Sequence, residues 1–120
     1  MTERDKIHIK SIKSELSFIK NALHEMDKEN FIKHDIIQHA VCMSIITIGE
    51  CANHLSEEFK EENIEIEWIQ IIAVRNIATH GYWQLNMEQI WQAIIEDIPK
   101  LNIFFMNYRY YCKVGNLYRR

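Results

Sequence analysis

Residues that break regular structure are scarce in this chain, which contains three glycines and one proline among 120 residues. Sandwiches and barrels built from many short strands need frequent turns, and glycine and proline form many of those turns. Hydrophobic residues make up 48% of the chain, which is enough for a packed core in a domain of this length. The sequence therefore predicts an all-α protein with a single domain over residues 1–120.

Apolar residues recur at spacings of three and four along much of the chain, which is typical of helices with a buried face. The first stretch predicts a helix over about residues 4–26. The second predicts one long helix from Phe31 to about Phe59, with Asn30 as its N-cap. The acidic stretch over residues 57–67 is expected to form a solvated helix end and a loop.

Two further helices are expected in the second half of the chain. A third helix is predicted from Trp68 to His80, with Gly81 as a left-handed cap. A fourth begins after Asn86 as N-cap and is bent by Pro99, whose ring removes a helical hydrogen bond. The expected fold is an up-and-down bundle of four main helices, followed by a basic, tyrosine-rich tail at about residues 107–120.

Charge and cysteine content narrow the classes of function. The net charge of −3 argues against a wholly basic nucleic-acid-binding protein, although it leaves room for a local basic site. Cys42, Cys51 and Cys112 form no C-x-x-C pair, and free thiols suit a reducing cytoplasm. The N-terminus is charged, and no run approaches about 18 apolar residues, so we expect neither a signal peptide nor a membrane span.

The segment Arg75-Asn76-Ile77-Ala78-Thr79-His80-Gly81-Tyr82 sets a fixed cation, an imidazole and a phenol within eight residues, directly after an apolar run. An arginine at such a boundary needs a structural anion or a ligand. Near the end of a helix His80 favours its charged form, and an imidazolium beside a guanidinium suits a phosphate. Asn76 lies four residues before His80 and shares its helix face. The alternative is structural, with Arg75 paired to a carboxylate and His80 closing a helix end.

Glu50 is the carboxylate that we expect beside this segment. It lies on the same ridge of the second predicted helix as Met43, Ile46 and His54, next to buried positions. From there it could orient Arg75 or His80, as a carboxylate orients a catalytic imidazole. The alternative is an ion pair that only joins two helices.

Other reactive residues carry weaker signals. His34 and His39 are five residues apart, and Asp35 with His39 gives only two ligands, so no metal site is predicted. The tyrosines and cations of the tail either bind single-stranded nucleic acid or form a packing arm or a frayed end.

The segment from Arg75 to Tyr82 matches the pattern R-x-x-x-x-H-x-Y and resembles the HepT-like branch of the HEPN superfamily. Ile48-Gly49-Glu50, Trp68 and Ile98-Pro99 look like landmarks of the same family in the same order, so the resemblance covers about residues 5–110. It implies a helical bundle that forms a homodimer, with the two copies of the motif facing a shared cleft.

The resemblance also implies an activity. Members of this branch are cytoplasmic toxins of toxin–antitoxin pairs and behave as metal-independent ribonucleases that need no cofactor. Arg75 and His80 would be the catalytic pair, with Asn76 and Glu50 in support and RNA rather than DNA as the substrate. Tyr82 would be the tyrosine to which the partner, a minimal nucleotidyltransferase antitoxin, transfers AMP.

Two other functions are compatible with the same residues. The chain could be a non-catalytic subunit that binds a nucleotide or docks the nucleotidyltransferase. It could also be a helical scaffold in which the pair of Arg75 and Glu50 is purely structural.

Overall fold

The computed structural model describes residues 1–84 and 87–107, but not the side chains of residues 80–84 and 107. All regular structure in these described ranges is helical, which confirms the predicted all-α class. The helices are α1 (Glu3–Ala22), α2 (Lys28–Lys33), α3 (Asp35–His54), α4 (Glu57–Glu62), α5 (Trp68–Gln84), α6 (Met87–Glu96) and α7 (Ile98–Asn107).

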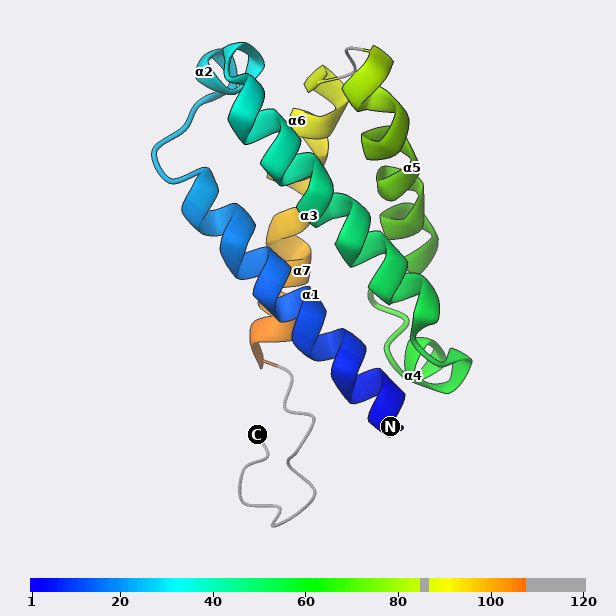
Figure 1. The fold of residues 1–120 in the computed structure, drawn as a ribbon. Helices are drawn as coiled ribbons and strands as arrows, with labels where there is room; N and C mark the ends of the chain where they lie inside the picture. Colours follow the sequence, from blue (N-terminus) through cyan, green and yellow to red (C-terminus); the bar gives the residue numbers. More distant parts are fainter. Residues whose placement is uncertain (85–86, 108–120) are drawn as a thin grey trace.

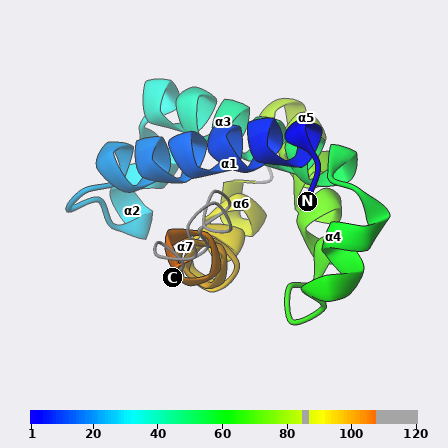
Figure 2. The ribbon, with the colours of Figure 1, turned by 90° about the horizontal axis from the view of Figure 1, so that it is seen from below.

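The central helix is α3, which packs against α1 on one side and α5 on the other (Figure 1). Helices α6 and α7 follow α5 and return beneath α1, so that α1 and α3 form one layer and α6 and α7 a second (Figure 2). The short helix α2 contacts both α3 and α6. One buried cluster contains residues from all seven described helices, so the long helices share a single core.

Helix α1 forms where its apolar stripe predicts it. Ile9, Ile12, Leu16 and Ile19 are at most 2% exposed, as expected for one helical face against a core. The helix begins with a capping box, in which the Thr2 side chain accepts from the backbone N–H of Asp5 and the Asp5 carboxylate accepts from that of Thr2. It ends at Ala22, four residues before the predicted end.

The prediction of one long helix from Phe31 to Phe59 is wrong, because the chain breaks twice there. Asp27 rather than Asn30 is the N-cap of α2, and α2 stops at Lys33. The Gln38 side-chain amide donates to the carbonyl oxygens of Phe31 and Ile32, at 2.8 Å each, and so satisfies backbone groups at the end of α2. The break at His34 barely interrupts the spacing of the apolar residues, so this spacing could not reveal where α2 ends.

The acidic stretch after α3 is more ordered than predicted. Ser56 caps α4, whose Phe59 is 2% exposed and belongs to the core, while Glu57 and Glu58 face solvent. A six-residue helix with one apolar anchor has too few turns to show a periodicity.

The third and fourth predicted helices also differ in extent. Helix α5 continues through Gly81 to Gln84, so Gly81 is not the left-handed cap that we expected. The predicted cap Asn86 lies outside the described residues. The predicted bend is a full break at Asp97, and Pro99 lies in the first turn of α7, where its missing N–H needs no helical partner.

Helix α3 is long and apolar enough to cross a membrane by length and composition alone. Core helices of globular proteins pass the same test. Its packing between α1 and α5 gives α3 the contacts of a central core helix.

Candidate active site

Arg75 lies in the middle of α5 on the side that faces α3, with 21% of its side chain exposed. Its Nη1 donates to Oε2 of Glu50 on α3 at 2.9 Å. Of the two expected partners of Glu50, the structure therefore brings it to Arg75, whereas the His80 side chain lies outside those described. This pair joins the two helices that carry the candidate site.

Asn76 holds the other edge of the same guanidinium. Its Oδ1 accepts from Nε of Arg75 at 3.3 Å and from Nη2 at 3.1 Å. Among the described residues, these bonds use three of the five guanidinium N–H groups and leave one on each terminal nitrogen. Two such donors can bind two phosphoryl oxygens, which is the geometry for which arginine is suited.

Gly49 is the residue that lets Arg75 lie against α3. A Cβ atom built on Gly49 would be 2.4 Å from Cβ of Arg75 and 2.9 Å from its Cγ. Contacts this short essentially never occur between a Cβ atom and the side chain of another helix, so a side chain at position 49 would push α3 and α5 apart or displace Arg75. The absence of a side chain there fixes the depth at which the guanidinium lies between the helices.

The ion pair between Arg75 and Glu50 is only partly shielded from water, because 53% of the Glu50 side chain is exposed. Exposed pairs contribute roughly 0–1 kcal/mol to stability. The pair therefore orients the guanidinium more than it stabilises the folded state. It also offsets one unit of positive charge at the place where a phosphate would bind.

His80 and Tyr82 lie on the same continuous helix as Arg75. On an ideal α-helix, positions five apart are separated by roughly 140° around the axis, whereas positions seven apart share a face about two turns along. Position 82 is therefore aligned with position 75, and position 80 is not. The expectation that the His80 side chain opens onto the same pocket as Arg75 concerns a side chain outside those described.

The remaining candidates have local roles. Nδ1 of His34 accepts from the backbone N–H of Ile37 at 3.3 Å, so His34 is the N-cap of α3. Nδ1 of His39 lies 2.8 Å from the carbonyl oxygen of Asp35. In the described part of the chain, no three His, Cys, Asp or Glu side chains form a group that could hold a metal ion.

The two cysteines of α3 are buried. Burial raises the pKa of the Cys42 thiol to about 11 and also raises that of Cys51. Thiols of this kind hold their protons at neutral pH and are weak nucleophiles. Cys112 lies outside the described residues.

Comparison with known proteins decides the family. The family model described as ribonuclease HepT-like matches residues 12–107, which is most of the chain. The chain belongs to the ribonuclease HepT-like family. The matched range contains Glu50, Arg75, His80 and Tyr82, and it confirms the resemblance that the motif suggested.

Relatives of this HepT-like chain carry related names. A protein of Caldanaerobacter subterraneus subsp. tengcongensis named "Putative RNase" is 29% identical over 94 residues, covering 78% of this chain and 84% of the relative. "Probable ribonuclease HepT" of Thermococcus cleftensis is 27% identical over 101 residues, covering 84% and 92%. No solved structure matches the chain. Membership of this family supports an endoribonuclease activity.

Two residues important to this HepT-like fold were missed in the sequence. Gly49 was noted only as a landmark, although a glycine inside an apolar helix costs about 1 kcal/mol relative to alanine and signals a close approach. Asp5 was not noted at all. It is 0% exposed and accepts from the backbone N–H and the hydroxyl of Ser56 at 2.8 Å and 2.7 Å, tying α1 to the start of α4. The Thr2-x-x-Asp5 spacing was the available signal.

Proposed function

We propose that this chain is the toxin of a toxin–antitoxin pair and that it cleaves RNA in the cytoplasm without a metal ion. The observation that carries the proposal is the family match over residues 12–107, because it includes the whole motif from Arg75 to Tyr82. The cluster of Glu50, Arg75 and Asn76 supports it by offering two guanidinium N–H groups.

The proposed reaction needs a proton transfer and fixed positive charge. RNA carries its own nucleophile, so the 2′-oxygen loses its proton, bonds to the phosphorus and displaces the 5′-oxygen, which takes up a proton. His80 would serve as general base or acid. Arg75 would stabilise the charge on the phosphoryl oxygens, with Asn76 and Glu50 holding its guanidinium in position. DNA lacks the 2′-hydroxyl and should not be cleaved.

The first test replaces His80 with alanine. Wild-type protein in EDTA should cleave RNA to products ending in 2′,3′-cyclic phosphate or 3′-phosphate. The RNA cleavage rate of His80→Ala should be at least about 100-fold lower than that of wild type, which is typical when a proton-transfer group is removed. His24→Ala, at an exposed site beyond α1, is the matched control and should keep full activity. A folded His80→Ala protein that still cleaves would remove His80 from the mechanism.

A homodimer is the proposed active form. Ile36, Met43 and Glu50 are seven residues apart on α3 and therefore share a face, as do Ile69 and Asn76 on α5. The three apolar residues of these faces, Ile36, Met43 and Ile69, are 75%, 61% and 86% exposed. A second copy packed on these faces would cover them and bring the two motifs together.

Silencing by AMP transfer to Tyr82 is the proposed regulation. The phenol oxygen would attack the α-phosphorus of ATP, expel pyrophosphate and acquire an adenylyl group. Since positions 75 and 82 share a face of α5, the group would add bulk and negative charge on the side of the helix that carries Arg75. The proposed partner is a minimal nucleotidyltransferase.

Mass spectrometry after co-expression with such a nucleotidyltransferase tests this regulation. Tyr82 should carry one or more AMP units, and Tyr82→Phe should cleave RNA but escape silencing. A silenced toxin whose Tyr82 is unmodified would refute the proposal.

The ion pair favours a second candidate, because Glu50 already offsets the charge of Arg75. The chain would then be a non-catalytic subunit that binds a nucleotide or docks the nucleotidyltransferase. Expression of the chain alone discriminates between the two functions. It should stop growth if the chain is a toxin ribonuclease and be harmless if it is a binding subunit.

A further inference from the structure

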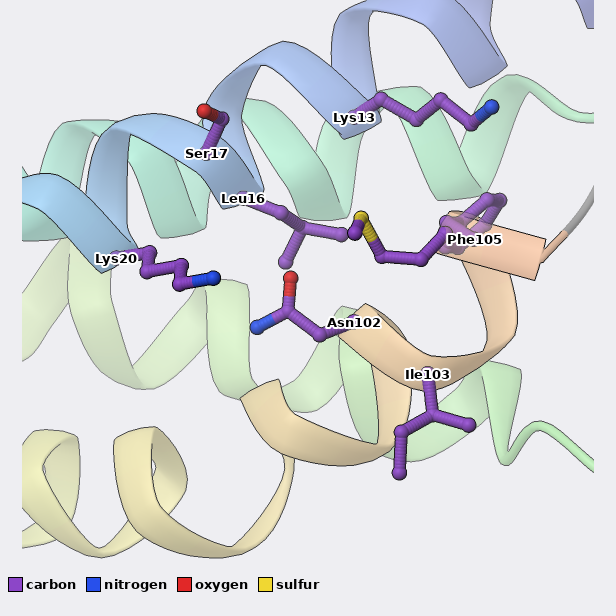
Figure 3. Close-up of a pocket in the computed structure, with 8 residues that line it drawn as sticks. Lys13, Leu16, Ser17, Lys20, Asn102, Ile103 and Phe105 are labelled. Carbon is purple, nitrogen blue, oxygen red and sulfur yellow. The ribbon is translucent and has the colours of Figure 1, made fainter.

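A cleft between α1 and α7 is a feature that the proposed ribonuclease does not use. Its volume is about 580 Å³, within the size range of ligand sites. It involves a different pair of helices from α3 and α5, which carry Glu50 and Arg75. Figure 3 shows the Lys20 and Asn102 side chains extending toward one another from α1 and α7.

The cleft has an apolar floor and an apolar rim. Leu16 and Phe105 form the floor and are 2% and 1% exposed. Ile103 and Met106, in the last two turns of α7, line the cleft and are 67% and 71% exposed. Large aliphatic side chains exposed beside a concave surface are typical of sites that receive another apolar surface, and methionine adapts readily to different partners.

The α1 side of the cleft is positively charged. Lys13 and Lys20 are seven residues apart and share a face of α1, with Ser17 between them. None of the described side chains that line the cleft is acidic. A ligand that fills the cleft therefore meets the ammonium group of Lys20 beside an aliphatic surface, with Lys13 two helical turns away along α1.

We propose that this cleft docks an acidic amphipathic segment of a partner protein. Its apolar side chains would contact Leu16, Ile103 and Met106, and its carboxylates would face the α1 lysines. Helices that bind in grooves use such apolar anchors at spacings of three and four residues. The charge of the cleft selects acidic segments over basic ones.

Two other occupants fit less well. Single-stranded RNA binds by stacking its bases on exposed rings, but Phe105, the one aromatic residue lining the cleft among the described residues, is buried. The chain's own tail after residue 107 contains four cations and no acid, so it would bring like charges to Lys13 and Lys20. An acidic protein segment matches both the charge and the aliphatic surface.

The test uses nuclear magnetic resonance of the full-length wild-type chain with three probes. The first is a helical peptide with leucines at spacings of three and four and glutamates elsewhere. The second is the same peptide with lysine for glutamate, and the third is a 2′-O-methyl uridine oligonucleotide, which cannot be cleaved. The acidic peptide should shift the amide signals of cleft residues on α1 and α7, and the other two probes should not.

Charge reversal at the cleft supplies the matched comparison. Lys20→Glu should weaken acidic-peptide binding by about fivefold, which corresponds to one exposed charge pair. Lys10→Glu makes the same charge change on α1 outside the cleft and should weaken binding by less than about twofold. The proposal is wrong if the oligonucleotide or the lysine peptide shifts the cleft residues instead. It is also wrong if the acidic peptide shifts none of them, or shifts them only after residues 108–120 are deleted.

Discussion

Arg75 is positioned by three neighbours, each acting in a different way. Gly49 sets how closely its stem approaches α3, Glu50 binds one end of the guanidinium, and Asn76 binds the adjoining edge. The sequence predicted Glu50 as the carboxylate beside the motif, because an arginine after an apolar run needs an anion. It could not reveal the contact at Gly49, since the approach of two helices depends on how both pack.

Replacing Gly49 with alanine tests the close approach. Alanine favours the helix by about 1 kcal/mol over glycine, but its Cβ would clash with the Arg75 stem, and overpacking costs typically 1–3 kcal/mol. We expect Gly49→Ala to lose about 1 kcal/mol of unfolding free energy in urea and to lower the rate of RNA cleavage. Ser14→Ala, on the exposed face of α1, should stay within about 0.5 kcal/mol of wild type. A Gly49→Ala protein more stable than wild type would contradict the close approach.

The helices differ in how well periodicity predicts them. The α1 stripe is regular, and its four central apolar residues, Ile9, Ile12, Leu16 and Ile19, are all buried. The breaks at His34 and Asp97 depend instead on local hydrogen bonds and on packing, which spacing does not record. The His34 ring caps α3 while the Gln38 amide closes α2, and both contacts are made by side chains that look unremarkable in the sequence.

The junction of α1 and α3 should be sensitive to acid. The His8 and His54 rings stack with centroids 5.5 Å apart, and Nη2 of Arg4 lies 3.5 Å from Nδ1 of His54. Burial, with help from His54 and Arg4 and against the opposing charge of Asp5, lowers the pKa of His8 below its ordinary 6.5. Unfolded chains therefore bind more protons than folded ones just below pH 6.5, and stability falls as the pH drops through this range.

Urea unfolding of a His8→Gln variant measures this effect. Its loss of stability between about pH 7.5 and pH 5.5 should be smaller than that of wild type, because one proton-binding difference is gone. His24→Gln, at an exposed histidine, should follow the wild-type curve. Asp5 does not obscure the comparison. Burial alone would raise its pKa, but hydrogen bonds from Ser56 and Thr2 lower it below the ordinary 3.8, so its contribution is lost progressively at pH values well below the compared range. Identical curves for His8→Gln and wild type would exclude His8 as the cause.

The whole molecule exposes apolar residues on the faces of α3 and α5 that also carry Glu50 and Asn76. If a second copy packs on these faces, the dimer interface and the proposed cleavage site share one surface of the molecule. The sequence suggested such a dimer through its family resemblance, and the second predicted helix has apolar residues on two sides, as a central bundle helix or a dimer face would have. The exposure of these residues could not be predicted from periodicity, because α3 is apolar on more than one face.

Met43→Glu should disrupt the proposed dimer, because it places a charge in the centre of the expected interface. Light scattering coupled to size-exclusion chromatography should show a monomer, and RNA cleavage should fall with dimer content. Ile64→Glu is the matched control. Ile64 is 78% exposed in the segment after α4, so this change should affect neither property. A dimeric Met43→Glu protein would place the interface elsewhere.

The two protonated, buried thiols of α3 can report how often the core of this protein opens. An alkylating reagent such as iodoacetamide reaches Cys42 or Cys51 only when the central helix separates from its neighbours. In a Cys112→Ser background, the labelling rate at these two positions therefore measures how often the core opens, without any added probe.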